Sequence, residues 1–208
     1  MVTRIQFAFV RKSPKQARSR QMVERLIASA HAVLVRDGYD AFSTNRVAEH
    51  AGVSPGSLYQ YFPNKAALVD TVIDRWSDEI SDRVAASLTD RLDVVGPDMI
   101  RTTTDALLTA LESDAPLLRI VWEELPAARH HARQRALEQR VKELLTVYLT
   151  AGGATRPDSA ATAWVLVMAM ENISVRWVLD RPELSRTRLL DELVALAAGL
   201  GIVRQSTA

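Results

Sequence analysis

The chain has 208 residues, enough for one sizeable core or two small domains, which excludes fibres, mini-scaffolds and large multidomain enzymes. Hydrophobic residues make up 48% and charged residues 25%, a composition typical of a folded globular chain rather than a disordered one. Because the chain contains no cysteine, disulfides, thiolate nucleophiles, iron–sulfur clusters and cysteine zinc sites are excluded. A reducing cytoplasm therefore suits it.

Neither end nor middle of the chain predicts a membrane segment. The longest apolar stretch, 160–170, is eleven residues with one threonine inside, well short of the roughly 20 that a bilayer span needs. The N-terminus lacks the apolar core and the cleavage site of a secretory signal. We expect no contact with a membrane and a cytoplasmic location.

Charge is divided unevenly along the chain. Residues 1–65 hold 10 Lys/Arg against 4 Asp/Glu, whereas residues 66–208 hold 16 against 21, so net charges of +6 and −5 add up to the overall +1. The first twenty residues carry six basic side chains and no acidic one. This is typical of a basic arm that lies along a polyanion, although a solvated tail fits equally well when the segment is taken alone.

The first two predicted elements are helices. Apolar residues recur at helical spacing over about 15–37, and Gly38 follows as a stop. Ser43 or Thr44 can cap a second helix of two turns, which ends near Gly52, where glycine makes a positive φ inexpensive. Both boundaries are set by local sequence.

The later elements are helical too. Ser54 caps a third helix with Pro55 at its first position, and Asn64 caps a fourth that runs from Lys65 as far as Leu92. No alternating strand pattern occurs, so we expect an all-α protein of about nine helices. The remaining helices are expected at about 97–113, 116–125, 129–151, 158–180 and 184–199.

Residues 43–62 have the pattern of a helix-turn-helix: two short helices joined by a glycine-containing turn. Small apolar residues allow the two helices to cross closely, and the second helix keeps a polar outer face. Such a face can enter a DNA groove about 12 Å wide without steric clash. The inner residues are Val47, Ala48, Ala51, Val53 and Leu58; the outer ones include Ser54, Pro55, Ser57 and Gln60.

From Arg20 through the fourth helix, the sequence resembles the DNA-binding domain of the TetR family of transcriptional regulators. The resemblance covers about sixty residues and departs only mildly, with Ser57 and Ser43 where the family often has threonine. It is carried by Gly38-Tyr39, Ser43-Thr44, Val47-Ala48, Ala51-Gly52-Val53-Ser54, Gly56-Ser57-Leu58-Tyr59-Gln60-Tyr61-Phe62 and Asn64-Lys65-Ala66-Ala67-Leu68.

The resemblance implies an architecture and a DNA site. A basic arm (1–17) would precede a three-helix helix-turn-helix domain (18–78), and the long fourth helix would join it to a helical ligand-sensing and dimerisation domain (79–208). Hydroxyls and a cation suit phosphate, whereas Arg, Asn and Gln can each discriminate a base by about 1 to 3 kcal/mol. The implied phosphate contacts are Thr44, Tyr59, Tyr61 and Lys65; the base-reading residues Asn45, Arg46, Ser54, Pro55, Gly56, Ser57 and Gln60; the arm contacts Lys15 and Arg18.

The second half carries no sharp motif. Tryptophans and methionines build apolar pockets, but ordinary core packing explains each of them equally well. By resemblance, this half binds a small apolar or amphipathic effector and forms a homodimer through its last two helices. The pocket candidates are Trp122, Trp164, Met168 and Asn172; the dimer candidates are Val175, Arg176, Leu189, Leu193 and Leu196.

The expected function is a TetR-like repressor that an effector releases from a palindromic operator, without a cofactor or metal. The alternative is a helix-turn-helix protein that acts without a ligand, in an architectural or partner-regulated role. Gly52-Val53-Ser54-Pro55-Gly56 matches the G-x-S-x-G pattern of a hydrolase, but that elbow requires a preceding buried strand. The four histidines lack metal-ligand spacing, so we expect no enzyme.

Overall fold

The computed structural model describes residues 17–89, 97–125 and 159–200. Within these ranges every regular element is a helix, which confirms the predicted all-α class. The described residues separate into two compact units: 17–78 with 119–125, and 79–118 with 159–200. Each unit is described by itself below.

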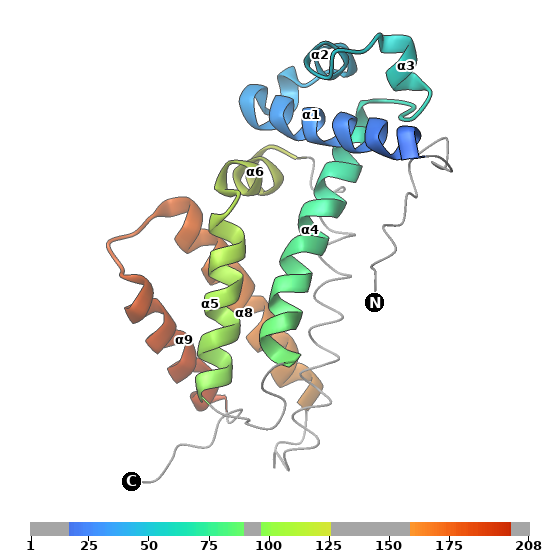
Figure 1. The fold of residues 1–208 in the computed structure, drawn as a ribbon. Helices are drawn as coiled ribbons and strands as arrows, with labels where there is room; N and C mark the ends of the chain where they lie inside the picture. Colours follow the sequence, from blue (N-terminus) through green and yellow to red (C-terminus); the bar gives the residue numbers. More distant parts are fainter. Residues whose placement is uncertain (1–16, 90–96, 126–158, 201–208) are drawn as a thin grey trace. The chain divides into compact units, whose positions relative to one another are not determined.

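The first unit is built on α1 (Ala17–Ala41), with α2 (Thr44–His50) packed against it and α3 (Pro55–Tyr59) packed against α2 (Figure 1). The beginning of α4 (Lys65–Thr89) belongs to the same unit. Apolar side chains from all four helices are removed from water, which is the main stabilising term for so small a unit. Fully buried members of this core are Leu26, Leu34, Leu58, Phe62 and Leu68.

Helix α1 is interrupted at Gly38, as the sequence predicted. Its regular part ends there because Gly38 has φ +75° and ψ 171°, a conformation that a side chain would disfavour. The chain then makes a last turn in which the Phe42 amide donates to the Gly38 carbonyl at 3.2 Å. Ser43 follows in extended conformation and starts α2.

Helix α5 (Pro97–Glu112) follows α4 in the described chain, and two short elements come after it: α6 (Ala115–Arg119) and the π-helical turn η1 (Ile120–Glu124). Asp114 accepts a hydrogen bond from the Leu117 amide at 3.3 Å and so caps α6. Turn η1 belongs to the first unit, where it packs against α1, whereas α5 and most of α6 belong to the second.

In the second unit α5 packs against both α8 (Ser159–Asp180) and α9 (Arg186–Gly199) (Figure 1). Their contact is an apolar cluster that is reinforced by partly buried residues of the same helices. Its buried members are Met99, Ile100, Ala163, Leu166 and Ala197.

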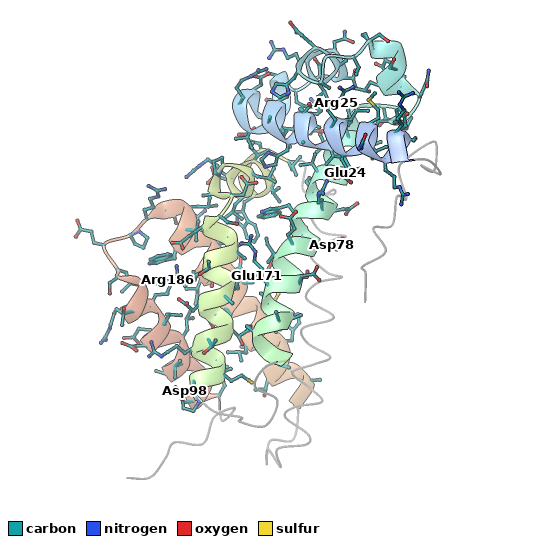
Figure 2. The ribbon with its side chains drawn as sticks, viewed as in Figure 1. Glu24, Arg25, Asp78, Asp98, Glu171 and Arg186 are labelled. Atoms are coloured by element: carbon teal, nitrogen blue, oxygen red, sulfur yellow. The ribbon has the colours of Figure 1, made fainter. Side chains whose placement is uncertain are left out.

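One arginine at the start of α9 forms ion pairs and hydrogen bonds with α5. Arg186, labelled in Figure 2, pairs with Asp105 at 2.6 Å and with Glu112 at 2.6 Å. Its guanidinium also donates to the Asp105 carbonyl at 2.8 Å and to Thr109 Oγ1 at 2.5 Å. The planar, multiply donating guanidinium suits such a site in a way that a lysine ammonium does not.

The helix boundaries agree closely with the predicted ones. Helices α5, α8 and α9 lie within two residues of the expected ranges, and α4 begins at Lys65. The predicted third helix is shorter than its pattern indicated, since α3 ends at Tyr59 and Gln60 forms its C-cap. The helix expected over 129–151 lies outside the described residues, as do residues 1–16 of the basic arm expected over 1–17, whose last residue, Ala17, begins α1.

Candidate nucleic-acid interface

Local hydrogen bonds fix both ends of α2. Ser43 is its N-cap, because Ser43 Oγ accepts the Arg46 amide at 3.3 Å. At the other end Gly52 adopts φ +64°, and its amide donates to the Glu49 carbonyl at 3.0 Å. This is the positive-φ helix ending that the sequence predicted, and it turns the chain sharply toward α3.

Helix α3 begins with a pair of serine hydroxyls. Ser54 Oγ accepts the Ser57 amide at 3.2 Å and lies 2.9 Å from Ser57 Oγ, while Pro55 occupies the first helical turn. Ser54, Pro55, Gly56 and Gln60 are exposed, and Ser57 is half-buried. The small polar face expected of a reading helix is therefore accessible, but two of its hydroxyls already hydrogen-bond to each other.

A second hydroxyl pair joins the two helices. Thr44 Oγ1 lies 3.0 Å from the Tyr59 hydroxyl, so the beginning of α2 and the end of α3 meet there. The sequence left open whether Ser43 or Thr44 caps α2; Ser43 is the cap, so the Thr44 hydroxyl is not used as one. Two adjacent hydroxyls can donate to one phosphate oxygen or to neighbouring ones.

Tyr61 lies outside α3, in the turn before α4. Its hydroxyl is 3.5 Å from Ser19 Oγ, so it is next to the first turn of α1. Arg18 is exposed in that same turn, and Lys15 lies outside the described residues. Tyr61 follows Tyr59 by two residues, but its hydroxyl is next to α1 and not to the Thr44–Tyr59 pair.

Lys65 begins α4 and is half-buried. Its Nζ donates to the Tyr39 carbonyl at 2.6 Å and lies 4.3 Å from the centre of the Tyr39 ring. Asn64 caps the helix, since its Oδ1 accepts the Ala67 amide at 2.9 Å. The ammonium has three N–H donors, so a phosphate can still be bound while the Tyr39 carbonyl is occupied.

Arg46, predicted to read a base, is held by an acidic residue that sequence reasoning missed. Its Nη1 lies 2.9 Å from Asp37 Oδ2, and Arg36 pairs with the same carboxylate at 2.7 Å. The hydrogen bond from Arg36, with a further one from Arg46, holds the pKa of the Asp37 carboxyl well below its usual range. Asn45 and Arg46 are nevertheless exposed, so both can reach a ligand.

The four pocket candidates do not come together in one unit. Trp122 lies in η1 and belongs to the first unit, whereas the other three are on α8 of the second. Trp164 is 52% exposed, and Asn172 is exposed with its Nδ2 donating to the Met168 carbonyl at 2.9 Å. Only Met168 of these three is partly buried.

The dimer candidates divide into buried and exposed residues. Val175, Leu189 and Leu193 are buried within the protomer itself, so their side chains are part of its own core. Leu196 is exposed, and Arg176 is exposed and pairs with Asp180 at 3.0 Å. The family resemblance pointed to the last two helices but could not say which side of each helix the protomer itself covers. The large exposed apolar side chains on α8 and α9 are Trp164, Val165, Ile173 and Leu196.

Two buried hydroxyls of the second unit were missed by sequence reasoning. Thr103 Oγ1 on α5 and Ser174 Oγ on α8 are inaccessible and have no hydrogen-bond partner in the described structure. Because α5 and α8 pack against each other, the two hydroxyls lie on facing elements of one core. Buried polar groups usually have partners, which makes these two worth testing as ligand contacts.

Neither a metal centre nor a membrane helix is found in the described ranges. No group of three or more His, Asp or Glu side chains there could hold a metal ion. Among the described helices, none combines the length and the hydropathy needed to cross a bilayer.

Two helices in helix-turn-helix order, with an exposed polar face and hydroxyls at their junction, define a DNA-binding protein. Comparison with known families names the class more narrowly. Residues 26–72 match the family of bacterial regulatory proteins called the tetR family, and residues 96–200 match the tetracyclin repressor-like C-terminal domain. The chain belongs to the TetR family and is a DNA-binding transcriptional regulator, a class whose members are not enzymes.

Individual relatives agree with this assignment. The chain is 27% identical over 188 residues to the HTH-type transcriptional regulator CymR of Pseudomonas putida, covering 85% of this chain and 92% of that protein. It is 34% identical over 99 residues to a DNA-binding transcriptional repressor, TetR, of Mycobacteroides abscessus, covering 47% and 52%. The fold is similar to that of a TetR-like regulator from Rhodococcus sp. RHA1, with a TM-score of 0.67, 21% identity and 91% and 99% coverage.

Proposed function

We propose that this regulator is a repressor that binds a palindromic operator as a homodimer and releases it when a small apolar or amphipathic effector binds. The cytoplasm would be its place of action. The observation that carries the DNA part is the Thr44–Tyr59 hydroxyl pair, which lies at the junction of α2 and α3 beside their exposed polar face.

The polar groups of the first unit fall into two sets, one suited to contact DNA phosphates and one suited to read bases. Thr44, Tyr59 and Lys65 supply hydroxyls and a cation for phosphates, with Tyr61 and Arg18 as further contacts on the α1 side. Base reading falls to exposed side chains of α2 and α3. Those side chains are Asn45, Arg46, Ser54, Pro55, Gly56, Ser57 and Gln60. Lys15, together with the other basic residues before α1, would add a salt-dependent contact to the DNA backbone.

Exposed apolar side chains of α8 and α9 support a homodimer. Trp164, Val165 and Ile173 lie on α8 and Leu196 on α9, all at least 38% exposed, which is unfavourable in water unless a partner covers them. A two-fold dimer places two reading helices about 34 Å apart, one turn of DNA, and so requires a palindromic site.

The second unit supplies candidate effector contacts. An effector with a hydrogen-bonding group could satisfy Thr103 and Ser174, while partly buried Met168 offers apolar contact. Binding would shift the dimer between two states, with a coupling free energy of about 1 to 3 kcal/mol.

The experiment is a selection of genomic DNA fragments by the purified protein, followed by titration of the best fragment at several salt concentrations. We expect one palindromic sequence bound by a dimer with a steep salt slope. Thr44→Ala and Tyr59→Phe should each weaken binding to all sequences, whereas Gln60→Ala should relax preference at one base position. Asp98→Ala, on α5 of the second unit, is the control that should leave affinity unchanged.

Two other outcomes would change the proposal. Binding without sequence preference, together with no change in tryptophan fluorescence on addition of any apolar compound tested, would favour the architectural or partner-regulated alternative. Folded, ligand-free protein that binds no DNA would contradict the proposal.

A further inference from the structure

The break in α1 leaves one backbone amide without a helical acceptor, and a glutamate far along the chain accepts its hydrogen bond. Because Gly38 is not helical, the Tyr39 amide cannot donate to a carbonyl of the preceding helical turn. It donates instead to Glu124 Oε2 at 2.8 Å, across 85 positions of sequence. A Cβ on Gly38 would lie 3.0 Å from this same oxygen, so glycine also provides the space for the carboxylate.

Tyr39 also accepts a hydrogen bond at its carbonyl, from the side chain of Lys65. Lys65 Nζ donates to the Tyr39 carbonyl at 2.6 Å, and the ammonium lies 4.3 Å from the ring centre. Both backbone polar groups of Tyr39 are therefore bonded to charged side chains, one acidic and one basic. The Tyr39 carbonyl is the nearer acceptor of the Lys65 ammonium, with the Asp40 carbonyl at 3.5 Å, and the Tyr39 amide is in turn bonded to Glu124.

Glu124 lies in η1, a turn that is packed against α1. It is the last residue of η1, which packs against α1 through a turn whose Ile120 and Val121 are buried. Its neighbour Glu123 points elsewhere and pairs with Arg119 at 3.0 Å. The chain therefore has two adjacent glutamates of equal charge, of which only Glu124 is bonded to the Tyr39 amide.

We propose that Glu124 is a positioning residue for DNA binding, which holds Tyr39 so that the Lys65 ammonium at the start of α4 is presented to a DNA phosphate. The inference rests on the proposed role of Lys65. The proposal predicts a change in DNA affinity opposite to that expected from charge alone. An acidic side chain ordinarily repels DNA, so by charge alone its removal should tighten binding. Positioning requires that removal weaken binding.

The test compares the operator affinities of Glu124 and Glu123 variants, using the DNA fragment selected from the genome. Glu124→Ala should weaken binding on the order of tenfold, the value of the Lys65–phosphate hydrogen bond that is no longer correctly presented. Glu124→Gln keeps an acceptor and should bind within about threefold of the wild type. Glu123→Ala removes the same charge without touching Tyr39, so its affinity should be unchanged or slightly higher.

A double-variant cycle separates positioning through Lys65 from a general loss of structure. In a Lys65→Ala background, Glu124→Ala should cause less than a twofold further loss, because the group it positions is already absent. Hydrogen exchange of the Tyr39 amide should accelerate in Glu124→Ala and not in Glu123→Ala. If Glu124→Ala does not fold, Glu124→Asp, which keeps the charge but is one methylene shorter, should show the same weakening.

The inference is overturned if Glu124→Ala binds as tightly as Glu123→Ala, or if its loss is undiminished in the Lys65→Ala background. Failure of the proposed function gives a different result, because the wild-type protein itself would then bind no DNA.

Discussion

The two units of the chain differ in how far local sequence decides their surfaces. In the first unit, caps and turns place the polar side chains: Ser43 and Ser54 start α2 and α3, and Gly52 separates them. In the second unit, Ser185 caps α9 in the same way, but a cap does not decide which side of a long helix is covered, and several residues predicted for an interface are buried within the protomer. Short capped helices thus fix which side chains are exposed, whereas long apolar helices leave this to packing.

The largest expected effect tests the core of the first unit. Leu58 is fully buried at the crossing of α2 and α3, so Leu58→Ala should lower the free energy of unfolding by about 4 kcal/mol. Chemical denaturation followed by circular dichroism measures this loss. Gln60→Ala, at an exposed position of the same segment, is the matched control and should change stability by less than about 0.5 kcal/mol.

A pair of leucines on α9 tests the division of the second unit into core and interface. Leu193 is 2% exposed and Leu196 38% exposed. Leu193→Ala should lower the free energy of unfolding by about 3 kcal/mol, because it leaves a cavity. Leu196→Ala should leave protomer stability nearly unchanged but raise the dimer dissociation constant, measured by analytical ultracentrifugation. Equal effects of the two substitutions on stability would contradict this division.

Arg186 provides a smaller effect within the same unit. Arg186→Ala removes its bonds to Asp105, Thr109 and Glu112 and should cost about 1 to 2 kcal/mol in thermal or chemical unfolding. Arg186→Lys should not restore the full stability, since an ammonium cannot form the same set of bonds. The control is Arg188→Ala, whose partner is the exposed Glu192 four residues later; this surface pair should be worth under about 0.5 kcal/mol.

The smallest effect concerns pH. The pKa of Asp37 is lowered in the folded protein by Arg36 and Arg46, whereas an unfolded aspartate titrates near pH 4. Its ion pairs therefore add stability above about pH 4, and this contribution disappears as the pH falls toward the folded value. The melting temperature of Asp37→Asn should lie below that of the wild type at neutral pH, with the gap closing in acid. If the difference in melting temperature grew as the pH fell, the ion pairs of Asp37 would not be what stabilises the folded protein at neutral pH.

The sequence by itself determined the helical class, the family and most helix boundaries, because these depend on signals within a few residues. Serine caps, the proline at the start of α3 and the positive-φ glycines at positions 38 and 52 each act on their own neighbourhood. The polar outer face of α2 and α3 followed from the same local pattern.

Only the tertiary structure decided which partners those residues find across the chain. The contacts of Glu124 with Tyr39 and of Arg186 with α5 join positions more than seventy residues apart, so no spacing in the sequence indicates them. Asp37 was overlooked because its link to Arg46 depends on the turn between α1 and α2. Likewise, the sequence places two leucines, Leu193 and Leu196, on one predicted helix, but only the packing of α9 against α5 determines which of them is covered.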